Sequence, residues 1–352
     1  MTKWHLTIRI ENDYQFQIQM NGVSKVKKFL STLLSAAFLI GCFTGCAVSN
    51  TGSNNKIQIV TTIFPEYDWV MNILGSNPAN AEVTLLLDNG TDLHSFQPTA
   101  NDILKISNCD LFVYVGGESD EWVEDVLKEA INKDMISINL LDQLGDSVKE
   151  EEIVEGMQAE DECEEGEEDE EEIEYDEHVW LSLKNASILA DSISDAISKI
   201  DPANAETYKN NTASYKETLN ALDLNYQEVV VNASVKTVLF GDRFPFRYLT
   251  DDYGLDYYAA FVGCSAESEA SFETITFLAK KVDELSLPAI LTIEGQDKRI
   301  AETIADNTST KDQQILTIDS MQSVTSQDVK DGATYVSIMG ANLEVLKKAL
   351  GY

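Results

Sequence analysis

The chain has few of the residues that bind transition metals or carry positive charge. Of its 352 residues only three are histidine, five are cysteine and six are proline, and 25 basic residues stand against 61 acidic ones. The formal net charge of −36 repels phosphate backbones, which argues against nucleic acid as a partner. Cys109, Cys163 and Cys264 show no C-x-x-C spacing, so the sequence predicts neither a cysteine-based metal knuckle nor a disulfide framework.

Hydrophobic residues make up 43% of the chain, which is enough for a large buried core and excludes wholesale disorder. The length allows two ordinary domains once a targeting segment is removed. Negative charge is concentrated in residues 150–177, which hold 18 acidic residues, half of the net charge, and no basic residue. Because this run repels itself and has few apolar residues, we expect residues 149–177 to form a disordered acidic loop.

Residues 1–46 have the pattern of a leader with a secretory signal. A cluster of lysines precedes an apolar run that is too short for a permanent transmembrane helix. The run ends at Cys42 in a pattern that resembles a bacterial lipobox, and a second match ends at Cys46. One of these cysteines is expected to carry a lipid anchor at the outer face of the bacterial cell membrane. Met20 is the expected start of translation, and the polar residues 47–55 are predicted to be a flexible tether.

Strand-like and helix-like patterns alternate through the rest of the chain. Short apolar strands are predicted at residues 56–62, 83–87, 111–115, 136–140, 235–240, 257–261, 290–293 and 314–318. This alternation is typical of an α/β fold with mostly parallel sheets. A long helix at residues 201–231 is predicted to connect an N-terminal lobe, residues 56–200, to a C-terminal lobe, residues 232–352. Because loops that follow strands line the cleft between such lobes, we expect ligand groups just after strands.

Two histidines stand in loop-like segments. His5 belongs to the leader, which leaves His94 and His178, the second at the start of a predicted helix. Neutral imidazole is a good zinc ligand, and two histidines supplied by separate segments suit an ion held between structural units. Taken alone, two loop histidines are more often ordinary surface residues, so this pattern needs a second line of support.

The segments around these histidines resemble the metal-binding cluster A-I solute-binding proteins of zinc and manganese ABC transporters. The similarity covers residues 56–352, and it is carried by residues 59–65 (IVTTIFP), 92–102 (DLHSFQPTAND), 177–186 (EHVWLSLKNA), 253–255, 265–271 and 318–320. The resemblance implies His94 and His178 as ligands from the N-terminal lobe, and Asp319 as a carboxylate ligand from the C-terminal lobe. Read by itself, Asp319 is a turn residue that caps the next segment.

The sequence departs from this family at the third ligand position. The family usually has histidine in zinc members or glutamate in manganese members after the strand that matches residues 235–240, but this chain has Gly241 and Asp242. Asp242 could replace the missing ligand, water could fill the position, or Asp242 could pair with Arg243 or Arg247 instead. Two imidazoles with one or two carboxylates favour Zn²⁺, with Mn²⁺ or iron as the alternative in the same role.

Other acidic residues allow more than one interpretation. Glu267 and Glu269 follow a predicted strand and face either the cleft or solvent, and Glu294 could orient a histidine. Zinc members of the family often carry a loop rich in histidine and acids where this chain has its acidic run. The run has no histidine, and carboxylates alone are hard ligands, so we expect it to concentrate cations without forming the high-affinity site.

Together these features predict a lipid-anchored, monomeric protein outside the cytoplasm that binds zinc and delivers it to an ABC permease, without enzyme activity. A secreted zinc hydrolase is a distant alternative, because two histidines and an aspartate can hold zinc with an open water position. The sequence has no H-E-x-x-H motif and no glutamate at a position that marks a general base. A surface adhesin is compatible with the same anchor, but no residue supports it over transport.

Overall fold

The computed structural model describes residues 56–158, 174–265, 269–295 and 297–352. The predictions made for the leader, for Met20, for Cys42 and Cys46, for the tether and for Glu267 concern residues outside these ranges. Within the described ranges we find no helix that combines the length and the apolar character needed to span a bilayer.

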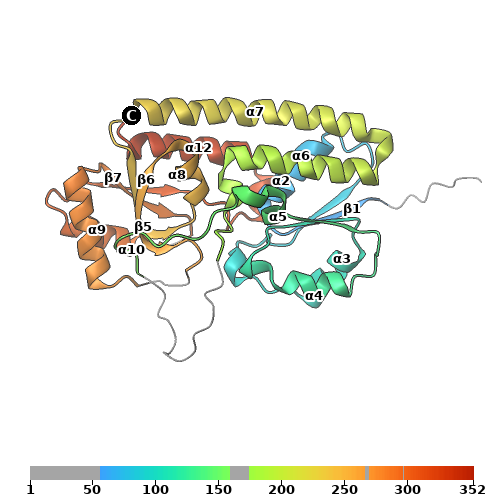
Figure 1. The fold of residues 1–352 in the computed structure, drawn as a ribbon, viewed down its shortest axis with the longest axis horizontal. Coiled ribbons are helices and arrows are strands. Elements are labelled where there is room, and N and C mark those ends of the chain that lie inside the picture. Colours follow the sequence, from blue (N-terminus) through green and yellow to red (C-terminus); the bar gives the residue numbers. More distant parts are fainter. Residues whose placement is uncertain (1–55, 159–173, 266–268, 296) are drawn as a thin grey trace, which may run out of the picture. The chain divides into compact units, whose positions relative to one another are not determined.

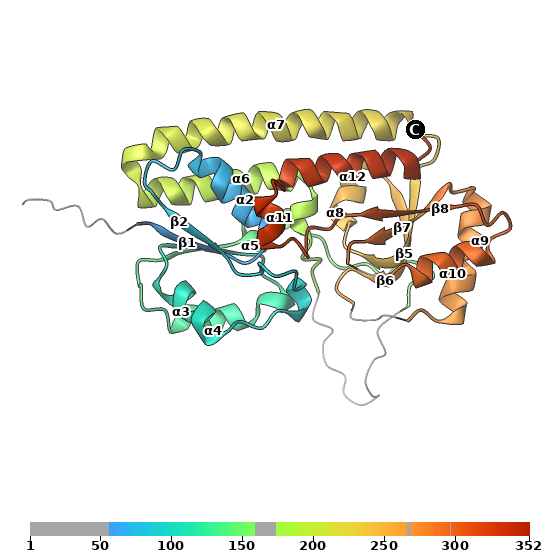
Figure 2. The ribbon, with the colours of Figure 1, turned by 180° about the vertical axis from the view of Figure 1, so that it is seen from behind.

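The first lobe contains a four-stranded parallel sheet with the strand order β2-β1-β3-β4. Its strands are β1 (Gln58–Thr61), β2 (Glu82–Leu85), β3 (Leu111–Tyr114) and β4 (Ile136–Asn139). The inner strands β1 and β3 are mostly buried and apolar, as expected for a parallel sheet that is covered on both faces. One face carries α2 (Phe64–Leu74), α5 (Leu140–Leu144) and α6 (Leu183–Ile200), and the other carries α3 (Ala100–Asn108) and α4 (Trp122–Lys128) (Figures 1 and 2).

The second lobe repeats this strand order as β6-β5-β7-β8, again parallel throughout. Its strands are β5 (Thr237–Phe244), β6 (Asp256–Val262), β7 (Ala289–Ile293) and β8 (Gln314–Ile318). Helices α9 (Phe272–Leu285) and α10 (Arg299–Asn307) cover one face, and α8 (Arg247–Tyr253) and α12 (Tyr335–Ala349) cover the other (Figure 2). The short helix α11 (Ser326–Lys330) precedes α12. In both sheets successive strands are added first towards one side and then, beyond the two inner strands, towards the other. Ligands of open α/β sheets bind at the carboxyl ends of the strands, beside this switch point.

The two lobes are joined by α7 (Ala205–Asn232), a helix of 28 residues that runs over both sheets (Figure 1). Asn211 Nδ2 donates to the Ile73 carbonyl at 2.9 Å near one end, and the Tyr226 hydroxyl donates to the Met339 carbonyl at 2.6 Å near the other. The helix is therefore packed against both lobes. The predicted α/β fold with two parallel sheets and a helical connection is confirmed, although the helix begins at Ala205 after a short 3₁₀ turn.

The acidic run has defined contacts at its two ends. Glu150 and Tyr175 form an antiparallel bridge, which ties the start of the run to its end. The predicted disorder of residues 149–177 is therefore wrong for residues 149–158 and 174–177, and the rest of the run lies outside the described residues.

Ion pairs with the C-terminal lobe explain this order. Glu152 pairs with Arg247 of α8, and Glu155 pairs with Lys281 of α9 at 3.6 Å. The Gln158 N–H donates to the Ala260 carbonyl at 2.9 Å. Each of these ion pairs contributes little by itself, but together with the backbone hydrogen bonds they fix the start of the run against the C-terminal lobe.

Candidate metal site

His94 lies in a 3₁₀ turn, Leu93–Ser95, in the connection that follows β2. Asp92 caps this turn, because its Oδ1 accepts from the His94 N–H at 3.0 Å. The other oxygen of Asp92 pairs with the Arg243 guanidinium of β5 at 2.7 Å. A residue of the C-terminal lobe thus helps to hold the turn that carries His94.

His178 lies directly after the acidic run and is completely buried. Asp176 Oδ1 accepts from the His178 N–H at 2.8 Å and lies 3.0 Å from Nδ1 of the same ring. The next turn, Val179–Leu181, contains Trp180, whose indole N–H donates to the Ser320 carbonyl at 2.8 Å. The His178 backbone is therefore fixed by the carboxylate before it and by the C-terminal lobe after it.

The structure brings the two histidines together, with 3.2 Å between their Nε2 atoms. Zinc–nitrogen bonds of 2.0–2.1 Å in a tetrahedral site place two ligating nitrogens about 3.3 Å apart. An ion therefore fits between these imidazoles with little movement of either ring.

The remaining ring nitrogens have acceptors of their own. Nδ1 of His178 faces Asp176, while Nδ1 of His94 lies 2.8 Å from Ser119 Oγ and 3.6 Å from Glu177 Oε2. When Nδ1 of His178 donates its proton to Asp176 and Nδ1 of His94 donates to Ser119, each Nε2 presents its lone pair to the other. Metal-bound histidines are typically held in this way by a second hydrogen bond.

Burial and charge move the pKa values of the two histidines in opposite directions. Burial, followed by the charge of His178, lowers the pKa of His94 to about 3. Burial of His178 disfavours its charged form, but Asp176 and Glu177 together outweigh burial and raise its pKa. A cation that binds between the imidazoles competes with protons, because ligating imidazoles are neutral.

Cys264 is a third residue at this site, which the sequence analysis did not select. Its Sγ and one ring nitrogen from each of His94 and His178 all lie within 4.8 Å of one another, and we find no other such group of three histidine, cysteine or acidic side chains in the described part of the chain. Burial, together with the charges of Glu151 and Glu177, raises the pKa of Cys264. The signal that was available is its place two residues beyond β6, at the ligand-binding edge of the sheet.

A pocket of about 260 Å³ opens at this cluster. His94 and Cys264 line it together with acidic side chains, namely Glu118, Glu151, Glu174 and Glu177. One carboxylate oxygen each of Glu151 and Glu177 is buried without a hydrogen-bond partner. Unsatisfied buried oxygens are rare and costly, and here they create a negative potential that attracts a cation.

Asp242 does not join this cluster. Its Oδ2 accepts from the Ile293 N–H at 3.0 Å and its Oδ1 accepts from the Arg243 N–H at 2.9 Å. Gly241, at the position where the resemblance implies a ligand, is packed against α10, and a Cβ there would lie 2.6 Å from Ala301 Cα. No side chain fits at residue 241, and ligation by Asp242 stays a prediction.

Asp319 also lies outside the cluster. Its Oδ1 accepts from the Met321 N–H at 2.7 Å, which is the turn-capping role considered above. Burial and the charge of Glu294 raise the pKa of Asp319 to about 6. The Glu294 carboxylate accepts from the Ser320 N–H at 2.7 Å instead of orienting a histidine, and Glu269 is exposed. Ligation by Asp319 stays a prediction.

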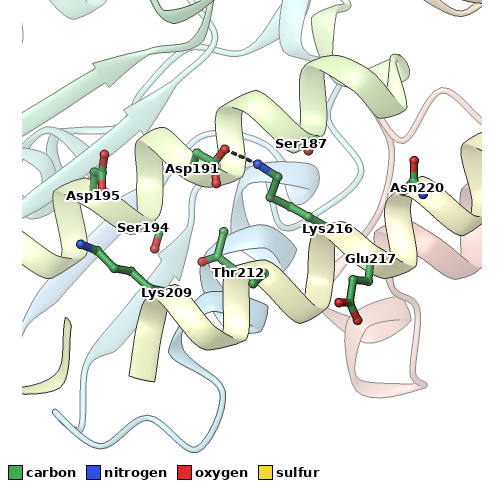
Figure 3. A pocket seen from close by; sticks show the side chains of 10 residues that line it. Ser187, Asp191, Ser194, Asp195, Lys209, Thr212, Lys216, Glu217 and Asn220 are labelled. Atoms are coloured by element: carbon green, nitrogen blue, oxygen red, sulfur yellow. Dashed lines mark hydrogen bonds and ion pairs between the residues drawn. The ribbon is translucent and has the colours of Figure 1, made fainter. Parts of the chain in front are cut away.

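A larger pocket, of about 820 Å³, lies between α6 and α7. Figure 3 shows polar side chains along both helices, with Lys216 paired to Asp191. Its lining contains no histidine or cysteine, and it lies between helices instead of at the ends of parallel strands. The chemistry of the side chains, and not the volume of a pocket, therefore identifies the candidate metal site.

The described fold agrees with comparisons to known proteins. A family model for the periplasmic zinc-uptake complex component A matches residues 59–349. The chain is 30% identical to the zinc-binding lipoprotein AdcA of Streptococcus pneumoniae serotype 4, over 93% of this chain and 61% of that protein. It is 28% identical to the high-affinity zinc uptake system protein ZnuA of Bacillus subtilis, over 90% of this chain and 96% of that protein.

A solved structure shows the same similarity. The Zn(II)-bound ZnuA-like domain of Streptococcus pneumoniae AdcA matches with a TM-score of 0.65 and 29% identity, over 85% of this chain and all of that one. The streptococcal relatives are longer proteins, and the matched region spans 56% to 61% of their length.

Proposed function

The chain belongs to the family of periplasmic zinc-uptake complex component A proteins, and from this premise we propose that it captures zinc outside the cytoplasm and delivers the ion to an ABC-type membrane permease. The observation that carries the proposal is the convergence of His94 and His178, whose Nε2 atoms lie 3.2 Å apart. The names of the relatives, a zinc-binding lipoprotein and a zinc uptake protein, support zinc as the ion. Zinc is the cargo of this protein.

Capture begins with the field of the acidic pocket. Carboxylates at the rim raise the local concentration of cations, and the paired imidazoles then supply directed lone pairs. The Asp92–Arg243 ion pair at 2.7 Å already links the two lobes beside the site, and α7 is packed against both. We therefore expect only small hinge motion when the ion binds or leaves.

The donor set decides the choice of metal. Imidazole nitrogen binds Zn²⁺ more tightly than Mn²⁺, whereas manganese prefers carboxylate and water oxygens. Two imidazoles at the centre of the site therefore favour zinc. Manganese or iron in the same transport role is the alternative, and it would require Asp242 or Asp319 to reach the ion.

The place of action follows from the sequence and the family. The lipobox-like pattern supports a lipid anchor at Cys42 or Cys46, and the similarity to a zinc-binding lipoprotein agrees with it. We propose that a monomer on the outer face of the membrane presents its loaded site to the permease.

The function proposed is binding without turnover. A zinc hydrolase needs a carboxylate placed to activate a zinc-bound water. Glu177 lines the pocket, but its Oε1 accepts from the Ser119 N–H at 2.9 Å and its Oε2 lies 3.6 Å from Nδ1 of His94. Glu177 thus contacts the backbone and the ring at the wall of the site. Zinc-loaded protein that turned over peptide or ester substrates would favour the hydrolase.

Calorimetric titration of the full chain with Zn²⁺ and Mn²⁺ tests the proposal. We expect one tightly bound zinc, and a loss of affinity greater than about 100-fold in both His94→Ala and His178→Ala, because removing even a partner of a ligand costs 10- to 100-fold. Asp191→Ala, in the pocket between α6 and α7, is the control and should bind zinc like the wild type. Unchanged zinc affinity in both histidine variants would refute the proposal.

A further inference from the structure

We infer that the Cys264 thiolate is a third ligand of the captured ion, so that the C-terminal lobe contributes sulfur to a site whose two imidazoles are His94 and His178. The inference rests on the proposed function, because it concerns the same ion. Its basis is the clustering of one sulfur and two ring nitrogens within 4.8 Å of one another.

The distances suit a tetrahedral ion. Zinc–sulfur bonds of 2.3 Å and zinc–nitrogen bonds of 2.0–2.1 Å place the sulfur and each nitrogen about 3.6 Å apart. The two Nε2 atoms already have the required separation, and the sulfur lies within 4.8 Å of one nitrogen of each ring. Ligation therefore requires the sulfur to move closer to the imidazole pair, by rotation about the Cα–Cβ bond of Cys264 or by a small shift of its loop. Water or a carboxylate oxygen can fill the fourth position.

The backbone before Cys264 is packed against one of the proposed ligands. Gly263 follows β6 directly, and a Cβ at this residue would lie 2.9 Å from Cε1 of His178 and 3.0 Å from the Phe244 carbonyl. Glycine is therefore needed for this loop to touch the His178 ring. The contact places the next residue, Cys264, in the wall of the pocket that also contains His94.

Sulfur is also the donor atom that the C-terminal lobe places in the wall of the pocket. Asp242 and Asp319 accept hydrogen bonds from backbone N–H groups of their own lobe, whereas Cys264 is a free, partly exposed cysteine that lines the pocket. When the thiol binds the ion, its S–H bond breaks, the proton leaves to solvent and an S–Zn bond forms without electron transfer. A thiolate is a softer ligand than a carboxylate and increases the preference for zinc over manganese.

Cobalt provides a probe for this ligand, because Co²⁺ occupies zinc sites and gives a sulfur-to-metal charge-transfer absorption only when a thiolate binds it. We expect the Co²⁺-loaded full chain to show this band and Cys264→Ser to lack it. We also expect Cys264→Ser to bind zinc at least about tenfold more weakly, as even the loss of an indirect partner has this effect. Cys109→Ser is the matched control, since Cys109 is a buried free thiol whose Sγ lies 3.4 Å from Met135 Sδ.

Cys264→His separates ligation from packing. An imidazole at this position should restore zinc binding to within about tenfold of the wild type, while the charge-transfer band stays absent. Circular dichroism of each variant reports on folding. A charge-transfer band that persists in Cys264→Ser would overturn the inference and leave the proposed function intact. Failure of the proposed function is distinguishable, because His94→Ala and His178→Ala would then bind zinc like the wild type.

Discussion

The two lobes have the same strand order but place different chemistry at the edge where ligands bind. In the N-terminal half of the site, Asp176 holds the imidazole of His178, and Ser119 holds that of His94. In the C-terminal lobe, Asp242 accepts from the backbone of Ile293. A buried carboxylate near the site therefore has two uses, either to hold a ligand or to hold the chain, and only its contacts distinguish them.

The N-terminal lobe uses carboxylates in both ways. Glu66, in the first turn of α2, accepts from the N–H groups of Thr62 and Ile63 at 2.8 and 3.3 Å. Asp120 accepts from the Gly116 N–H at 3.0 Å. Carboxylates that bind backbone N–H groups thus occur at the strand ends of both lobes, and the imidazoles distinguish the first lobe from the second.

The largest effect on zinc affinity is expected when a carboxylate that holds a ligand is compared with carboxylates that hold the chain. Asp176→Asn should weaken zinc binding by about 10- to 100-fold, because it disturbs the partner that orients His178. Asp242→Asn and Asp319→Asn should weaken it by less than about tenfold and instead cost about 1–3 kcal/mol of folding free energy, because a buried backbone N–H loses its charged acceptor. Calorimetry and urea unfolding of the three variants measure both quantities.

A result in the opposite sense would break the comparison. If Asp242→Asn or Asp319→Asn lost as much zinc affinity as His178→Ala, that carboxylate would be a ligand, which the family resemblance implies for Asp319. The C-terminal lobe would then have to rearrange when zinc binds, because both carboxylates are engaged with backbone N–H groups in the structure described.

The pH dependence of stability tests whether a carboxylate that binds backbone N–H groups, such as Glu66, is ionised in the folded protein. Complete burial and the charge of Asp120 raise the pKa of Glu66 to about 8, whereas the unfolded chain has an ordinary value near 4.5. Between pH 4.5 and pH 8 the folded protein binds one more proton than the unfolded chain. The stability that Glu66 contributes is therefore fully present below pH 4.5 and is lost as pH rises towards 8. We expect the wild type to lose about 2 kcal/mol relative to Glu66→Gln between pH 6 and 8.

Urea unfolding of both proteins at pH 6, 7 and 8 measures this difference. Titrating groups that do not interact with Glu66, including His178, are common to both proteins and cancel. Parallel stability profiles would show that Glu66 is ionised in the folded state, and that burial at this strand end does not suppress its charge.

The fold and the histidine pair were predictable because their signals are local. Short apolar strands alternate with helices along the sequence, and the segments that contain His94 and His178 are long enough to resemble those of a family. Neither signal requires knowledge of which distant residues touch. The prediction that the two imidazoles share one site depended on the resemblance, and the 3.2 Å between their Nε2 atoms agrees with it.

The features that were missed all depend on contacts between distant residues. Gly241 excludes a side chain because α10 brings Ala301 against it, 60 positions along the chain. The start of the acidic run is ordered because Arg247 lies beside Glu152 in the folded protein. No second cysteine lies at a metal-binding spacing from Cys264 in the sequence, so its place beside the histidines became visible only in the structure.

The smallest effect on affinity is expected from the acidic run that precedes His178 in the sequence. Replacing residues 160–172, which contain 11 acidic residues, by a Gly/Ser linker of equal length removes no imidazole and no proposed sulfur ligand, and it leaves the Glu150–Tyr175 bridge in place. Equilibrium zinc affinity should therefore change by less than about threefold, while the association rate at low salt falls several-fold because the negative potential that steers the ion is weaker. Stopped-flow measurements at low and high salt separate these effects, since screening should remove the rate difference at about 1 M salt. A loss of affinity of two orders of magnitude would instead assign the high-affinity site to the acidic run, and the contrast between the two lobes would no longer explain how zinc is held.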